Sequence, residues 1–103
     1  MKMSKAYQAF EIEAPQAYQQ WINMVFGLDH AIGMDKKTKE FCYITALAVA
    51  RIEDGLPFHV KMAKSSGATR DEVIGSILVA LPAVGNMVVK SLPLAIEAYD
   101  GDN

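Results

Sequence analysis

The feature that most constrains this chain is the segment from Phe41 to Ala50, in which every residue is apolar or weakly polar. It has no clear polar stripe, which predicts a helix that is buried nearly all round. A charged Glu40 stands at its entrance, a turn-forming stretch (53–57) follows, and His59 comes two residues beyond that turn. The order predicts two helices folded back on each other, one carrying a carboxylate and the other an imidazole. Such a pair suits proton chemistry, and it is equally typical of two core helices with polar ends.

Apolar residues at helical spacing and local capping signals predict further helices on both sides of this segment. Pro15 opens a helix that Gly27 ends, and Asp35 is expected to cap the buried helix. We expect Asp54 to cap the helix that carries His59, with Gly67 at its end. A capping box, Thr69 with Glu72, opens the next helix, and a last helix covers residues 83–99 with a bend at Pro93. Nothing resembles a strand, so the sequence predicts an all-α fold of about five to six helices.

The composition indicates one domain, residues 1–103, that associates with copies of itself. Apolar residues make up 51% of the chain and charged residues only 21%, which is rich in apolar side chains for a small monomer. A large exposed apolar patch usually marks an interface, so we expect a homo-oligomer. The net charge is −2 with no basic run, which argues against binding to nucleic acid or to an anionic membrane. The apolar stretch 73–89 is too short and too interrupted to span a bilayer.

Other residues of chemical interest give weak signals. Cys42 is the only cysteine and lies in the apolar run, so we expect a small core residue in a reducing, cytoplasmic protein. The N-terminal residues lack the apolar stretch of a signal peptide. His30 has only Asp29 and Asp35 nearby and no partner at ligand spacing, so no metal site and no cofactor are predicted.

Residues 36–85 resemble the carboxymuconolactone decarboxylase-like superfamily, which includes alkylhydroperoxidase D. The resemblance rests on Lys39-Glu40 before the apolar helix, on the helix bearing His59, and on the Gly67-Ala68-Thr69-Arg70-Asp71-Glu72 link. Members active on thiols carry two cysteines between the glutamate and the histidine. In that register Glu40 and His59 match, but the cysteine positions hold Ile52 and Gly55. Since neither side chain can form a thiolate, we expect no thiol peroxidase and no disulfide reductase activity.

The resemblance implies a trimer or a hexamer and a cofactor-free decarboxylation of a small carboxylic acid or lactone. The apolar run over residues 73–89 indicates that the helices after residue 70 contribute to the interface between subunits. Glu40 and His59 are the expected catalytic residues, and Arg51 or Lys61 would bind the substrate and stabilise an enolate. The alternative is a catalytically silent oligomer that binds a small-molecule ligand. A third, weaker hypothesis is a redox protein that uses Cys42 with a partner's thiol.

Simple helix geometry does not by itself bring the two site residues together. Glu40 lies roughly 16 Å from the turn and His59 only about 8 Å from it, at 1.5 Å rise per residue. A plain antiparallel hairpin leaves them about one and a half turns out of level. The resemblance implies that this gap is closed, and we predict that both groups line one shared, largely apolar pocket.

Overall fold

The computed structural model describes residues 4–101, and all of their regular structure is helical. The chain divides into two compact units, one formed by residues up to Met34 and one that begins at Asp35. The prediction of an all-α fold is confirmed, and no strand occurs in the described residues. The prediction of a single domain over residues 1–103 stays a prediction, and each unit is described by itself.

The first unit is a pair of helices, α1 (Lys5–Glu13) and α2 (Pro15–Ala31). Pro15 opens α2 as expected, because proline at the first helical position loses no hydrogen bond. The predicted end at Gly27 is wrong: α2 continues for another turn, to Ala31. An isolated glycine lowers helix propensity without ending a helix that is otherwise continuous. The rings of Phe10 and Tyr18 meet edge to face at 5.3 Å and join the two helices.

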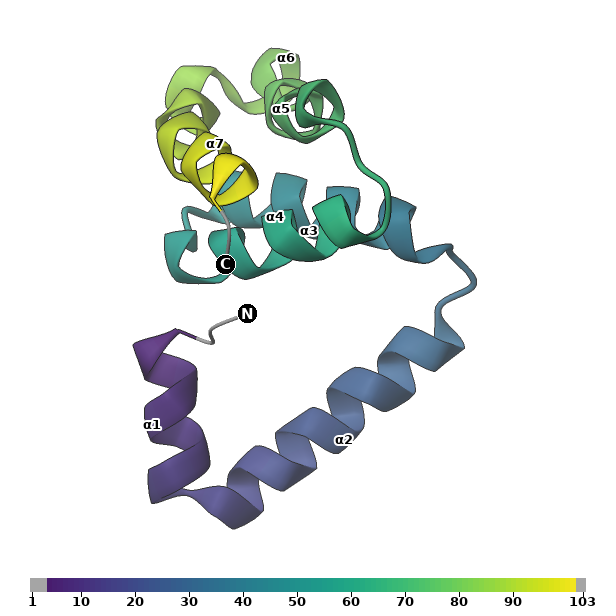
Figure 1. Ribbon diagram of the computed structural model, residues 1–103, viewed down its shortest axis with the longest axis vertical. Coiled ribbons are helices and arrows are strands. Elements are labelled where there is room, and N and C mark those ends of the chain that lie inside the picture. The colour runs from purple at the N-terminus through teal and green to yellow at the C-terminus, as the bar shows by residue number, and fades with distance from the viewer. Residues whose placement is uncertain (1–3, 102–103) are drawn as a thin grey trace. The chain divides into compact units, whose positions relative to one another are not determined.

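The second unit is built on a hairpin of α3 (Lys36–Ala50) and α4 (Leu56–Ser65), with α5 (Arg70–Leu78) and α7 (Leu92–Asp100) packed against it (Figure 1). Asp35 caps α3 through the N–H of Thr38, as predicted. The complete capping box of Thr69 and Glu72 opens α5, also as predicted. The core is made of aliphatic side chains from these helices and from the segments between them: Ile44, Ala48, Leu56, Val60, Ala63, Ala68, Val73, Ile77, Ala80, Val88, Ala95 and Ala98.

Three local predictions for this unit are wrong. Asp54 does not cap α4; it lies inside a 3₁₀ turn, η1 (Glu53–Gly55), that leads into the helix. The expected last helix is broken into α6 (Leu81–Val84), η2 (Asn86–Ser91) and α7, because Gly85 adopts a φ of 88° that ends α6. Finally, α3 is not buried all round, since only Glu40, Ile44 and Ala48 on it are buried. Its remaining apolar side chains are partly or fully exposed within the described chain.

Candidate active site

Glu40 and His59 form a direct hydrogen-bonded pair between α3 and α4. The Oε1 atom of Glu40 lies 2.7 Å from Nδ1 of His59. Glu40 is buried because it shares one face of α3 with Ile44 and Ala48, at spacings of four and eight residues. The carboxylate side chain is 9% exposed and the imidazole side chain 24% exposed. The pair therefore joins a buried carboxylate to a histidine that solvent and small molecules can reach.

The connection and the packing of the two helices explain how the expected gap is closed. Arg51 ends α3 in the left-handed conformation, with φ at 60°. The 3₁₀ turn η1, at about 2.0 Å rise per residue, lengthens this connection only slightly before α4 begins at Leu56. The packing of α4 against α3 and the long Glu40 side chain close the gap, as the 2.7 Å contact shows. The structure thus brings the two residues together, while their catalytic role stays a prediction.

Two aromatic rings that the sequence analysis did not single out surround the imidazole. Tyr43 stacks on His59 with ring centroids 4.6 Å apart and planes 26° from parallel. Phe58 meets His59 edge to face, at 5.3 Å and 85°. The sequence did contain a signal for Tyr43, since a residue three positions after Glu40 lies on the same side of a helix. The pair therefore lies in a partly aromatic environment in which the ring of Tyr43 covers one face of the imidazole.

The arrangement leaves one nitrogen of His59 available for chemistry. A carboxylate in its ionised form only accepts hydrogen bonds, so Nδ1–H is the donor of this contact, and a neutral imidazole then has its lone pair on Nε2. In the part of the chain that the structure describes, Nε2 has no hydrogen-bond partner. A histidine oriented in this way by a carboxylate is suited to give and take a proton at Nε2.

The two residues expected to bind substrate lie in other contacts. The Arg51 guanidinium pairs with Glu53 at 2.6 Å. The ammonium group of Lys61 donates to the carbonyl of Ala98, at the end of α7, over 2.8 Å. Lys61 is only two residues from His59, and such neighbours point to different sides of a helix. Neither residue is brought to the Glu40–His59 pair by a contact within residues 4–101, and their role in binding stays a prediction.

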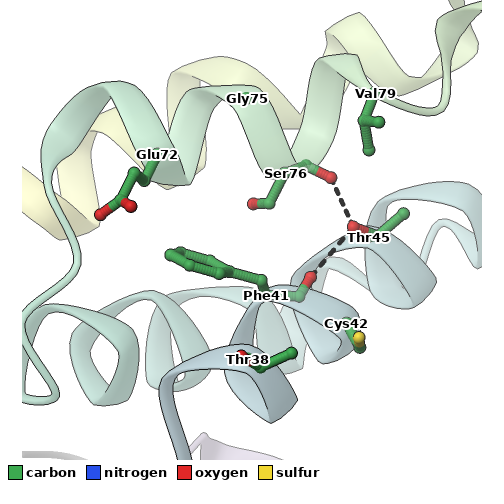
Figure 2. A pocket seen from close by; sticks show the side chains of 8 residues that line it. All are labelled: Thr38, Phe41, Cys42, Thr45, Glu72, Gly75, Ser76 and Val79. Carbon is green, nitrogen blue, oxygen red and sulfur yellow. Dashed lines mark hydrogen bonds between the residues drawn. The ribbon is translucent and has the colours of Figure 1, made fainter.

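A shallow apolar cavity of about 320 Å³ lies on the opposite side of α3, facing α5 (Figure 2). The Thr45 hydroxyl lies within hydrogen-bond distance of the carbonyls of Phe41 and Ser76, one on each helix, and links the two walls. The lining residues are Thr38, Phe41, Cys42, Thr45, Glu72, Gly75, Ser76 and Val79. Neither Glu40 nor His59 lines this cavity, so it is not the shared pocket that we predicted for the pair.

The cavity also corrects the expectation for Cys42. This cysteine is exposed, because it lies on the side of α3 that α5 only partly covers. It is therefore not a core residue. At the other end of the cavity, the hydrogen bond from the backbone N–H of Thr69 lowers the pKa of Glu72, and Lys37 at 3.6 Å acts in the same direction. The cavity thus has mostly apolar walls and one carboxylate at its rim, which is paired with Lys37.

Within residues 4–101 there is no cluster of three or more histidine, cysteine, aspartate or glutamate side chains that could hold a metal ion. Separately, none of the helices in the same range is long and apolar enough to cross a membrane. The two register positions where thiol-active relatives carry cysteines hold an exposed Ile52 and Gly55, which lies against Leu47.

A helical hairpin with a glutamate–histidine pair between its helices, followed by a capped apolar helix, defines a class of protein. The family model described as "carboxymuconolactone decarboxylase family" matches residues 15–97, which is most of the chain. The chain belongs to this family, and the resemblance seen in its sequence is confirmed. No curated protein matches the chain.

Proposed function

We propose that this protein is a cofactor-free acid–base enzyme that decarboxylates a small carboxylic acid or lactone. The observation that carries the proposal is the 2.7 Å contact between the buried Glu40 carboxylate and Nδ1 of His59, with Nε2 left open. A buried carboxylate that orients an accessible imidazole is a common way to prepare a general acid or base. Membership of the carboxymuconolactone decarboxylase family supports the reaction type.

In the proposed reaction the bond between the substrate carbon and its carboxylate breaks, and CO₂ leaves. The electron pair stays on the carbon skeleton and is delocalised as an enolate into the lactone carbonyl. His59 takes up a proton from water at Nε2 and delivers it to a carbon of this enolate. Glu40 balances the positive charge that the ring carries between these two steps. Arg51 or Lys61 would stabilise the enolate oxygen, after giving up its contact with Glu53 or Ala98.

The direct test is release of CO₂ from a carboxymuconolactone by the purified protein. We expect turnover by the unmodified protein and a loss of about 10²- to 10⁴-fold in kcat in His59→Gln, the usual contribution of a general acid or base. His30→Gln is the matched control, because it changes the other histidine, on α2, and leaves the pair intact. No turnover by the unmodified protein, or equal rates in His59→Gln, would count against the proposal.

The second candidate is a catalytically silent ligand-binding protein, favoured by the apolar cavity between α3 and α5. In this case Glu40 and His59 would be a structural pair. A Gly75→Leu variant should fill the cavity and abolish binding, since a Cβ at position 75 meets nothing within 4 Å. Gly27→Leu on α2 has equally open surroundings and serves as control. The readout is the chemical shifts of cavity residues during titration with small aromatic and aliphatic acids, and binding that survives Gly75→Leu would exclude the cavity.

We further propose that the protein is a cytoplasmic homo-oligomer, a trimer or a hexamer. The support is the apolar composition of the chain together with three exposed valines, Val79, Val84 and Val89, between the end of α5 and the end of η2. Exposed apolar side chains at this density are typical of an interface. Light scattering at micromolar concentration should give a molar mass that is three or six times the 11.3 kDa of one chain. The Val79→Lys variant should have a lower average molar mass, closer to that of the monomer. A single monomeric species of the unmodified protein would refute the oligomer.

A further inference from the structure

We propose that Tyr43 is a positioning residue for the catalytic imidazole, and that it acts through its ring and not through its hydroxyl group. This inference rests on the proposed function, because it concerns the same Glu40–His59 pair. The face of the Tyr43 ring would hold the imidazole of His59 in one orientation. In this orientation Nδ1 contacts Glu40 and Nε2 has no hydrogen-bond partner among the described residues.

A single hydrogen bond does not fix an imidazole. The 2.7 Å contact holds the Nδ1 atom, but the ring can still rock about that point and turn around its own side-chain bond. Tyr43 lies against one face of the ring, with centroids 4.6 Å apart and planes 26° from parallel. The ring of Phe58 meets the imidazole edge to face, with centroids 5.3 Å apart and planes at 85° to each other. Together, these two ring contacts restrict the motions of the imidazole that the hydrogen bond leaves free.

The exposure and hydrogen bonding of Tyr43 fit a role at the imidazole better than a role in the core. Its side chain is 37% exposed, so it is not a core residue. Its hydroxyl group makes no hydrogen bond within residues 4–101, although Tyr99 shows that a tyrosine in this fold can pair its hydroxyl with a backbone carbonyl. The aromatic contact of Tyr43 in the described residues is the stack on His59. Since Glu40 and Tyr43 are three residues apart on α3, one side of this helix supplies both the carboxylate and the stacking ring.

The ring of Tyr43 therefore explains what the carboxylate alone does not: how Nε2 keeps one direction while the imidazole remains partly exposed to solvent. A hydrogen bond that is open to water exchanges with water, whereas a stacked ring excludes water from the imidazole face. Loss of the ring should allow both tautomers of His59 to be populated, and Nε2 would then carry a proton for part of the time.

The experiment compares Tyr43→Phe, which keeps the ring, with Tyr43→Leu, which removes it. The full chain is labelled with ¹⁵N-histidine, and long-range ¹H–¹⁵N correlations report the two ring nitrogens of His59. We expect well-separated shifts for Nδ1 and Nε2 in the unmodified protein and in Tyr43→Phe, and convergence toward the averaged values of free histidine in Tyr43→Leu. His30, assigned through His30→Gln, is an internal reference that should not change. Tyr7→Leu is the matched control, because Tyr7 on α1 is 38% exposed.

Unchanged, separated His59 shifts in Tyr43→Leu would overturn the proposal, and so would a collapse in Tyr43→Phe, since the hydroxyl would then matter. If Tyr43→Leu does not fold by circular dichroism, Tyr43→Met replaces it and is judged by the same criterion. The readout needs no substrate, so absence of decarboxylation would refute the proposed function and leave the positioning role to be decided by the shifts. Where turnover is found, Tyr43→Leu should lower kcat and Tyr43→Phe should restore it.

Discussion

Residues 35–101 and residues 4–34 are both helical and similarly apolar, yet only the first of these units buries side chains in a core. The C-terminal unit buries twelve aliphatic side chains from the segments that follow Asp35. Neither α1 nor α2 has a buried residue, and Trp21, Phe26 and Leu28 on α2 remain exposed. Most helical stability in proteins comes from burial of one face and not from propensity. The folding free energy therefore resides mainly in the unit that carries Glu40 and His59.

The largest difference in stability between the two units should appear when one isoleucine in each unit is replaced by alanine. Ile44 is fully buried beneath the site, whereas Ile12 on α1 is 71% exposed. Ile44→Ala should lower the free energy of unfolding by about 2–5 kcal/mol, through lost burial and the cavity it leaves. Ile12→Ala should stay within about 0.5 kcal/mol. Urea unfolding followed by circular dichroism measures both, and similar costs would show that α1 is covered by another surface.

A smaller effect is expected from breaking one polar pair in each unit. His59→Leu leaves the buried Glu40 carboxylate without a partner and should destabilise by about 1–3 kcal/mol. The exposed Gln19–Asn23 hydrogen bond on α2 is the counterpart, and Gln19→Ala should cost about 0.2–0.5 kcal/mol.

The double variant Glu40→Leu/His59→Leu separates the cost of an unpaired group from the worth of the pair. It should recover much of the stability that His59→Leu loses, since no buried charge is then left unpaired. Thermal unfolding of the single and double variants forms the test, and a double variant that is less stable than His59→Leu contradicts this account.

The caps of α5 and α1 allow a third comparison. The capping box at Thr69 is complete, with its hydroxyl accepting from the N–H of Glu72 at 3.1 Å. Thr69→Ala should cost about 1 kcal/mol. Ser4 caps α1 through a longer bond of 3.3 Å to the N–H of Tyr7, and Ser4→Ala should fall near the low end, about 0.5 kcal/mol. Equal costs would mean that α1 is as firmly coupled to a core as α5.

The smallest effect is a dependence on pH that belongs to the C-terminal unit. Hydrogen bonding from Arg70 lowers the pKa of Asp100, and the backbone N–H of Thr69 lowers the pKa of Glu72. Each carboxylate binds fewer protons in the folded state, so its contribution to stability is present above its unfolded pKa, about 4, and is lost as the pH falls through the lower folded value. Asp100→Asn should flatten acid unfolding below about pH 4. Arg70→Gln should flatten it equally, and a steeper acid transition in either variant would contradict the sign.

The sequence by itself determined the helical class, the family and the local signals at Pro15, Asp35 and Thr69. These depend on side chains and backbone groups a few residues apart, and such short-range hydrogen bonds form in nearly any context. The order of residues also singled out Glu40 and His59, but that the two groups meet was implied by the resemblance and not by helix spacing. The predictions of a cap at Asp54, of a continuous helix through Gly85 and of a buried Cys42 were wrong. Each of these features depends on contacts with residues that are remote in the chain.

Only the tertiary structure decided which groups meet. The packing of α4 against α3 brings His59 to Glu40 and places the ring of Tyr43 on the imidazole. The same structure turns Arg51 and Lys61 to Glu53 and Ala98, and opens an apolar cavity on the other side of α3. The physical reason is that the side chains of a helix point outward in all directions. Packing against other helices then decides which of these side chains are brought together in a site.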